Sequence, residues 1–288
     1  MTVTEPMALL IEPLVRGALA EDLGRAGDLT TDTIVPVDAR ASGVLNARKA
    51  GVVAGLKVAE TAFRLLDPDV RFEVSRSDGA DVAPSQPIAT VTGRARALLT
   101  AERVALNFLC HLSGIATATR EIVDAVKGTR ARIACTRKTT PGLRLLEKYA
   151  VRVGGGVNHR FGLDDGVLLK DNHIVVAGGI RAAIETAKAR LGHMVKVEVE
   201  VDRLDQIDEA LAAHADAILL DNMTPAQMRE AVAVIDRRAI VEASGRITKE
   251  TAPAIAAAGV DVISCGWITH SAAILDIGLD FDDALTTR

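Results

Sequence analysis

The chain has 288 residues, of which 49% are hydrophobic and 2% aromatic, and its formal net charge is −4. This length suits one large domain or two modest domains with a substantial core. Few aromatic rings and a negative net charge both argue against a nucleic-acid partner. The three cysteines (Cys110, Cys135, Cys265) lie far apart without metal-ligand spacing, which is typical of a reducing compartment. No secretory signal pattern and no apolar run of about 18 residues is visible, so we expect a cytoplasmic protein with no membrane partner.

The first part of the chain mixes helical and strand patterns. A helix is expected over residues 8–20 and another over 57–66. Strands are expected at residues 43–47, 70–74 and 88–92. Residues 95–126 are predicted to be mostly helical, with a break near Ser113 and Gly114. This mixture favours a small α+β unit.

A regular alternation of strands and helices begins near residue 131. The expected strands are 131–135, 166–169, 195–201, 217–220, 239–243 and 260–264. The expected helices between them include 179–191, 204–213, 225–235 and 249–258. Such alternation predicts a parallel sheet with right-handed crossovers. We favour a barrel with a seventh strand hidden or irregular, and an open doubly wound sheet remains the alternative.

Polar residues follow each of these strands at the same point. They are Thr136, Arg137 and Lys138 after the first strand, Lys170 after the second, Glu200 at the end of the third, Asp221 after the fourth, Ser244 and Gly245 after the fifth, and Ser264, Cys265 and Gly266 at the end of the sixth. Because active sites of parallel α/β folds lie at the carboxyl ends of the strands, these residues predict a site there.

The third strand has a strict alternation. Its valines are expected on one side, under helices, and Lys196, Glu198 and Glu200 on the other. The charged side is predicted to face the inside of a barrel, with Glu200 nearest its mouth. Since unpaired buried charges are costly, we expect Lys196 and Glu198 to pair below Glu200.

Several cations lie between residues 137 and 170. Arg137, Lys138, Arg160 and Lys170 stand at strand ends or beyond glycines, and together they predict a pocket for a strongly anionic ligand. The residues of the predicted helix 143–153 are interpreted differently, as a solvated face with salt bridges: Arg144, Glu147, Lys148 and Arg152.

The carboxylates and glycines at the other strand ends have more than one interpretation. Glu200 and Asp221 could bind Mg²⁺, which prefers oxygen ligands and one or two carboxylates, or they could balance nearby cations or act as an acid/base pair. Gly245 and Gly266 could belong to a phosphate-binding cradle, or they could be ordinary turn glycines.

The order of these motifs resembles the quinolinate phosphoribosyltransferase family. The resemblance is carried by residues 101–108, 112–117, 136–144, 155–160, 170–173, 198–200, 220–222, 242–245, 266 and 269–271. It implies a small N-terminal α/β (α+β) domain, residues 1–115, packed on a seven-stranded α/β barrel, residues 116–288. The C-terminal tail is expected to return to the N-terminal domain.

The same resemblance implies an enzyme of NAD biosynthesis. It would join quinolinate to phosphoribosyl pyrophosphate and release pyrophosphate and carbon dioxide, giving nicotinate mononucleotide. The reaction is expected to require Mg²⁺ and no organic cofactor. Lys138, Lys170, Glu200 and Asp221 would be the catalytic residues, with Mg²⁺ at Glu200 and Asp221.

The resemblance also assigns the substrate contacts. Arg137, Arg160 and Lys170 would hold the quinolinate carboxylates with His159 beside them, and Lys138 would reach phosphoribosyl pyrophosphate. The remaining substrate-binding residues, several of them around the 5′-phosphate, would be Thr136, Ser244, Gly245, Arg246, Ser264, Cys265, Gly266 and His270. Arg246 and Trp267 stand where smaller residues are expected. Arg103 would enter the neighbouring subunit's site, which makes a homodimer, or an oligomer of dimers, the active form.

Three rival hypotheses remain. Lys170 could form a Schiff base in a barrel aldolase. The chain could instead be a non-catalytic barrel that senses phosphorylated metabolites. A related phosphoribosyltransferase acting on a different aromatic acid is the nearest competitor.

Overall fold

A computed structural model describes residues 3–281 of the chain, which form two compact units. The first unit contains residues 3–120, 140–155 and 271–281, and the second contains Glu121–Thr139 and Gly156–His270. Each unit therefore collects segments that are separate in the sequence. The predicted domain boundary between residues 115 and 116 stays a prediction.

The first unit is built on an antiparallel sheet with the strand order β12-β1-β5-β3. Its strands are β1 (Arg40–Ala47), β3 (Arg71–Val74), β5 (Pro87–Arg94) and β12 (Ile277–Phe281), and the short strands β2 (Gly51–Val52) and β4 (Asp81–Val82) pair separately. The helices α1 (Ala8–Leu23), α2 (Leu29–Ile34) and α3 (Leu56–Leu66) belong to the same unit. Three of the four long strands were expected from the sequence, whereas β12 was not. Its pairing with β1 brings the end of the described chain back to the first unit.

The helix α4 (Ala95–Ala125) is continuous, so the predicted break near Ser113 and Gly114 is wrong. Gly114 serves close packing instead of ending the helix. A Cβ atom at Gly114 would lie 2.8 Å from Cα of Ile274 and closer still to the carbonyl oxygen of Ala273. The glycine is therefore explained by the segment that runs beside the helix toward β12.

The helix α5 (Arg144–Val153) contradicts a second expectation. Glu147 is fully buried and Lys148 is 2% exposed, so this part of the helix is not a solvated face. The Glu147 carboxylate accepts hydrogen bonds from the main-chain N–H of Thr140 (3.1 Å) and lies 2.9 Å from His111 Nε2. Paired burial of this kind cannot be distinguished from a salt-bridged surface by the sequence pattern alone.

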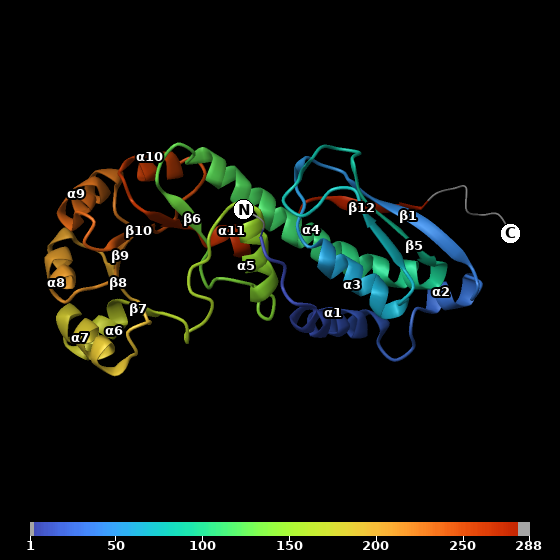
Figure 1. Cartoon of the computed structure of the whole chain (residues 1–288), viewed down its shortest axis with the longest axis horizontal. Helices are drawn as coiled ribbons and strands as arrows, with labels where there is room; N and C mark the ends of the chain where they lie inside the picture. The colour runs from blue at the N-terminus through green and yellow to red at the C-terminus, as the bar shows by residue number, and fades with distance from the viewer. Residues whose placement is uncertain (1–2, 282–288) are drawn as a thin grey trace. The chain divides into compact units, whose positions relative to one another are not determined.

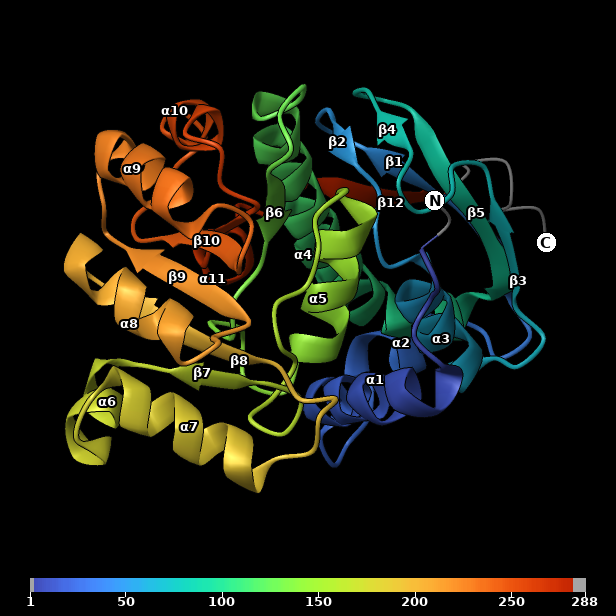
Figure 2. The same cartoon turned by 60° about the vertical axis from the view of Figure 1, so that its left-hand side comes forward.

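The second unit contains a six-stranded parallel sheet with the order β6-β11-β10-β9-β8-β7. Its strands are β6 (Arg132–Ala134), β7 (Val167–Leu169), β8 (Val197–Val201), β9 (Ala217–Asp221), β10 (Ile240–Ser244) and β11 (Val262–Ser264). Its helices are α6 (Asp171–Ala177), α7 (Ile180–Arg190), η1 (Leu204–Gln206), α8 (Ile207–Ala212), α9 (Pro225–Ile235), α10 (Ala252–Ala257) and α11 (Trp267–His270). The sheet curves, and α7, α8, α9 and α10 cover its outer side (Figures 1 and 2). All six predicted strands are present.

The alternation along β8 places its valines and glutamates as expected. Val197, Val199 and Val201 are buried, and Glu198 and Glu200 lie on the opposite face. The expected Lys196–Glu198 pair is wrong. Lys196 lies just before the strand, is 77% exposed and pairs with Asp216 at 2.8 Å. Because Lys196 lies one residue before β8, its side chain reaches solvent. The alternation of inward and outward side chains holds only for residues within the strand.

A short segment extends the sheet beyond β6. Val157 forms an isolated parallel bridge with Ala134, and its N–H donates to the Ile133 carbonyl at 2.8 Å. The second unit, residues 121–139 and 156–270, is thus a parallel α/β domain with six strands and one bridged segment.

Candidate active site

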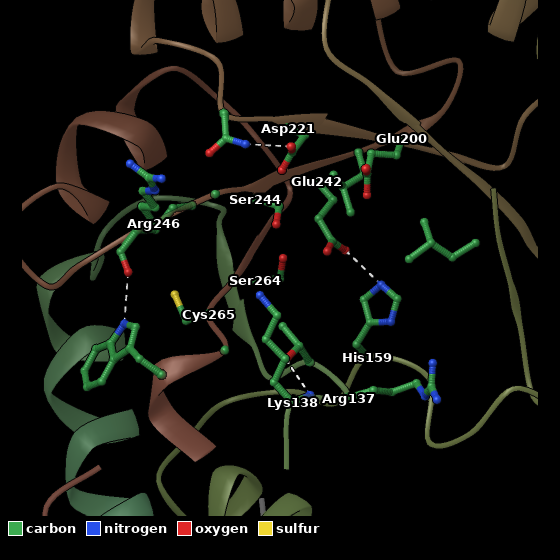
Figure 3. Close-up of a pocket in the computed structure, with 18 of the residues that line it drawn as sticks. Arg137, Lys138, His159, Glu200, Asp221, Glu242, Ser244, Arg246, Ser264 and Cys265 are labelled. Carbon is green, nitrogen blue, oxygen red and sulfur yellow. Dashed lines mark hydrogen bonds and ion pairs between the residues drawn. The ribbon is translucent and has the colours of Figure 1, made fainter. Parts of the chain in front are cut away.

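A cavity of about 830 Å³ lies at the carboxyl ends of the strands of the second unit. The residues predicted for the substrate site that line it are Thr136, Arg137, Lys138, His159, Arg160, Lys170, Glu200, Asp221, Ser244, Gly245, Arg246, Ser264, Cys265, Gly266 and His270. Figure 3 shows labelled members of this set pointing into one hollow from different strands. The carboxyl ends of the strands meet there because the strands are parallel.

Arg103 is the one predicted site residue that does not line this cavity. It lies on α4 in the first unit, and its side chain is 66% exposed. Its guanidinium is 4.0 Å from the carboxylate of its neighbour Glu102, too loose a contact to hold it in place. Arg103 is therefore accessible in a single chain.

Two arginines contribute positive charge to the cavity. Nε of Arg137 is buried and has no hydrogen-bond partner within residues 3–281. Arg160 donates through Nη1 to the carbonyl oxygen of Gly166 at 2.8 Å. Burial, followed by the neighbouring Arg137 cation, lowers the pKa of Arg160. These guanidinium groups are arranged for an anion, because a buried donor without a partner costs stability unless a ligand accepts from it.

The two predicted metal-binding carboxylates lie on one face of neighbouring strands. Glu200 is aligned with Leu219, and Asp221 follows two residues later on the same face. The Lys170 ammonium donates to Glu200 Oε2, and the Asn222 amide donates to Asp221 Oδ2 at 2.6 Å. These two bonds engage one oxygen of each carboxylate, so the other oxygen can accept from a ligand hydroxyl or bind a cation.

Glycines allow the main chain to approach closely at the ends of β10 and β11. Gly245 has a φ of +107°, and a Cβ there would lie 2.8 Å from Cγ of Asn222. A Cβ on Gly266 would lie 3.0 Å from Cδ of Lys138. Thr269 donates through Oγ1 to the Lys138 carbonyl at 2.8 Å, which holds the Lys138 main chain against the same loop. Gly245 is therefore required by its positive φ and by the close approach of Asn222, whereas a Cβ at Gly266 would need a small shift of the Lys138 side chain.

Arg246 and Trp267 lie in the same region of the cavity. Arg246 adopts a φ of +49°, an unusual conformation for a residue with a side chain, and it is exposed. Trp267 donates through Nε1 to the Ile247 carbonyl at 2.9 Å. This bond connects the loop after β10 to the start of α11.

Cys265 is unsuited to act as a nucleophile. It is 2% exposed, and burial, followed by the nearby Glu242 charge, raises the pKa of its thiol to about 12. Because the thiolate is the reactive form, the thiol stays inert at neutral pH.

The sequence did not identify three polar residues as part of this site. They are Glu198, Asn222 and Glu242. Glu242 is 5% exposed and points from β10 toward His159 (Figure 3). Glu198 Oε2 lies 2.9 Å from His159 Nε2. A signal for Glu242 existed, since Glu242 and Ser244 are two residues apart in one strand and must share a face.

The whole chain matches known families and structures. Residues 28–113 match the N-terminal domain of quinolinate phosphoribosyl transferase, and residues 115–280 match its C-terminal domain. The chain is 47% identical over 273 residues to the nicotinate-nucleotide pyrophosphorylase (carboxylating) of Mycobacterium leprae. This alignment covers 92% of the chain and 95% of the relative.

Solved structures agree with the sequence relatives. The nicotinate-nucleotide pyrophosphorylase of Francisella tularensis superposes with a TM-score of 0.93 at 38% identity, covering 98% of this chain and 99% of that one. The corresponding protein of Ehrlichia chaffeensis gives a TM-score of 0.91 at 39% identity, covering 97% of this chain and 100% of that one.

Among residues 3–281, no helix is long and apolar enough to span a membrane.

The unpartnered Arg137 Nε generates a prediction about stability. Replacing Arg137 with Met removes a desolvated donor but keeps a flexible chain of similar length, so the free energy of unfolding should rise by about 1 kcal/mol. Urea unfolding measures this change. Arg132→Met, at an exposed position at the start of β6, is the control and should stay within about 0.5 kcal/mol of the wild type. A loss of stability in Arg137→Met would show that Arg137 supports the fold and is not held ready for a ligand.

Proposed function

This chain belongs to the quinolinate phosphoribosyltransferase family, and we infer that it transfers a phosphoribosyl group from phosphoribosyl pyrophosphate to quinolinate. The products are nicotinate mononucleotide, pyrophosphate and carbon dioxide, in the biosynthesis of NAD. One observation supports the assignment most strongly. A single cavity joins a group of cations to two carboxylates and to glycine loops suited to a phosphate.

We propose that the cationic side of the cavity holds the pyridine dicarboxylate. Arg137, Arg160 and Lys170 line this side, and a planar guanidinium can hold a carboxylate through two parallel hydrogen bonds. The two carboxylates of quinolinate and the phosphates of the second substrate repel one another in solution. A preorganised set of cations offsets this repulsion and aligns the ring nitrogen with the ribose carbon.

The other side of the cavity is proposed to bind the phosphoribosyl group. Positive charge develops on the ribose carbon as its bond to pyrophosphate breaks, and Glu200 and Asp221 stabilise that charge from nearby. Lys138 meets the departing pyrophosphate, while Ser244 and the main-chain N–H groups near Gly245 and Gly266 hold the 5′-phosphate. After transfer, the carboxylate leaves as carbon dioxide, its electron pair stays on the ring carbon beside the cationic nitrogen, and a proton from solvent is then added to that carbon.

Mg²⁺ is proposed as the metal of this reaction. Glu200 and Asp221 fit it, because they supply hard oxygen donors on one face of adjacent strands and because Mg²⁺ needs few protein carboxylates. The Lys170 ammonium engages Oε2 of Glu200, and Glu200 lines the cavity, so its other oxygen would be the one to face the metal. When bound, Mg²⁺ would neutralise charge on the pyrophosphate.

We also propose that the sheet of the second unit closes into a seven-stranded barrel. The bridged segment at Val157 would be its seventh strand, between β6 and β7. Support comes from Arg160, whose guanidinium reaches from the end of this segment to the Gly166 carbonyl just before β7. In the proposed barrel, the hydrogen bond from Arg160 to the Gly166 carbonyl would join the Val157 segment to β7 in place of main-chain hydrogen bonds.

The active form is proposed to be a homodimer, or an oligomer of dimers, in which Arg103 completes the partner's site. The side chain of Arg103 is exposed and loosely held in a single chain. Two-fold symmetry would complete both sites reciprocally.

The aldolase hypothesis is disfavoured by the environment of Lys170. A Schiff base requires a free amine at the reacting carbonyl, whereas the Lys170 amine is engaged with the Glu200 carboxylate. A phosphoribosyltransferase for a different aromatic acid differs in the number of ligand carboxylates, which an assay can distinguish.

Quinolinate should be turned over and nicotinate should not. With one carboxylate fewer, the site retains an uncompensated cation, a penalty of about 2 kcal/mol or more, equivalent to at least thirtyfold in kcat/KM. The measurement is the release of pyrophosphate and carbon dioxide from phosphoribosyl pyrophosphate with each acid. Equal turnover of nicotinate would contradict the dicarboxylate assignment.

Asp221→Asn should raise the Mg²⁺ concentration for half-maximal activity about tenfold and leave the melting temperature unchanged. The amide keeps the shape of the side chain but loses the charge that attracts the cation. A magnesium titration measures this shift, and Asp202→Asn, an exposed change after β8, is the control. An unaltered titration would remove Asp221 from the proposed metal site.

Arg103→Ala and Lys170→Ala should each be nearly inactive alone, and their mixture should regain activity. In a mixed dimer one site combines an intact Arg103 with an intact Lys170, so recovery approaches about a quarter of the wild-type rate under random exchange. Mass measurement of exchanged dimers is the control for subunit mixing. Exchange without recovery would show that the site is not shared.

A further inference from the structure

Three side chains of the second unit form a compact polar cluster beside the cation group. His159 Nε2 lies 2.9 Å from Glu198 Oε2 and 3.5 Å from Glu242 Oε2. The side chains of His159, Glu198 and Glu242 are 16%, 11% and 6% exposed. Neither glutamate has a role in the reaction described above, yet burying two carboxylates together is costly. We therefore asked what function offsets the cost of burying Glu198 and Glu242 together.

The hydrogen bond at the other ring nitrogen determines which nitrogen of His159 is protonated. The main-chain N–H of Arg160 donates to His159 Nδ1 at 2.9 Å. Because a main-chain N–H can only donate, Nδ1 must carry a lone pair and the ring proton must be on Nε2. That proton points to Glu198, so the ring is neutral and both nitrogens are already engaged.

Glu242 lies beside the His159–Glu198 pair, with its Oε2 3.5 Å from His159 Nε2. Burial, followed by the nearby charge of Glu198, raises the pKa of Glu242. Glu242 Oε1 is buried without a hydrogen-bond partner in the described part of the chain, which suits a protonated carboxyl better than an ion. Glu198 Oε2 is therefore the nearer acceptor for the Nε2 proton of His159, and Glu242 Oε2 is the more distant one.

The same three residues have the composition of a metal site, and their candidate ligand atoms lie within 4.8 Å of one another. A cation bound at Nε2 would need the ring proton on Nδ1, where the N–H of Arg160 already points. The adjacent Arg137 and Arg160 cations would also repel it. The geometry therefore favours a proton between the ring and the carboxylates.

We propose that Glu198 and Glu242 are positioning residues, which hold His159 in the Nε2-protonated form so that Nδ1 fixes the main chain of Arg160. Arg160 is then held at two points, by His159 at its N–H and by the Gly166 carbonyl at its guanidinium. Arg160 lines the cavity, so its other guanidinium N–H groups can donate to a ligand carboxylate there. His159 thus acts on the ligand through Arg160. The inference rests on the proposed function, because the ligand is taken to be a dicarboxylate.

The protonation of His159 can be measured without turnover. Uniformly ¹⁵N-histidine-labelled enzyme, with the His159 signals assigned by their loss in His159→Asn, should show an unprotonated Nδ1 and a protonated Nε2 at neutral pH. An imidazolium signal or a protonated Nδ1 would overturn the proposal. Stoichiometric Zn²⁺ binding lost in Glu242→Gln would also overturn it, in favour of a metal site.

Kinetics of Glu198→Gln test the consequence for the ligand. Unlike the carboxylate, the amide can also donate to Nε2, so the ring proton is no longer confined to Nε2 and the bond with Arg160 is weakened. The KM for quinolinate should rise at least tenfold, while kcat changes less than threefold and the KM for phosphoribosyl pyrophosphate stays constant. Glu121→Gln is the matched control, since it neutralises an exposed glutamate paired with Lys249, and it should leave all three values unchanged. A KM for quinolinate within twofold of the wild type would overturn the proposal.

Two substitutions of His159 keep the test decisive if Glu198→Gln fails to fold. Asn can present a carbonyl oxygen where Nδ1 accepts from Arg160, whereas Gln places its polar group near the position of Nε2. His159→Asn should therefore retain a KM for quinolinate at least fivefold lower than that of His159→Gln. Equal increases in the KM for quinolinate would indicate direct contact between His159 and the ligand, and would overturn the proposal.

Absence of quinolinate turnover by the wild type would contradict the proposed function, and the NMR measurement would still decide the protonation of His159.

Discussion

The register of one parallel sheet places the functional side chains of the second unit. Glu200, Leu219 and Glu242 are aligned across β8, β9 and β10, and Asp221 and Ser244 are aligned one repeat further toward the carboxyl ends. All these side chains share the face opposite the buried valines. A shift of one residue in any strand would turn its acidic groups into the helical layer. Binding and packing therefore depend on the same pairing.

Much of this arrangement could be predicted, because it follows from two simple periodicities. The strands were visible as β-branched runs, and the polar residue after each run marked the edge where the cavity lies. The alternation that placed Glu198 and Glu200 inside also applies to Glu242, so that group could have been found. Asn222 was less visible, since its role depends on a positive φ of 54° and on its closeness to Gly245.

Other features depend on contacts between distant segments, and no local pattern reports them. Gly114 resembles a helix breaker, but its helix continues and the glycine makes room for residues 273 and 274. Glu147 has the spacing of a surface ion pair but is buried beside His111. Strand β12 is recognisable only through its pairing with β1. In each case a tertiary contact overrides the local signal.

The charges of the cavity explain why so polar a site is stable without its ligands. Arg137 and Arg160 lie close enough for the charge of Arg137 to lower the pKa of Arg160, so a site made of cations alone would repel itself. Glu200 balances Lys170 directly, and the charge of Glu198 acts favourably on Arg160. The second buried carboxyl, Glu242, avoids excess negative charge by holding its proton more tightly. The unliganded site thus keeps a limited positive surplus, large enough to attract a dianion and small enough to leave the fold intact.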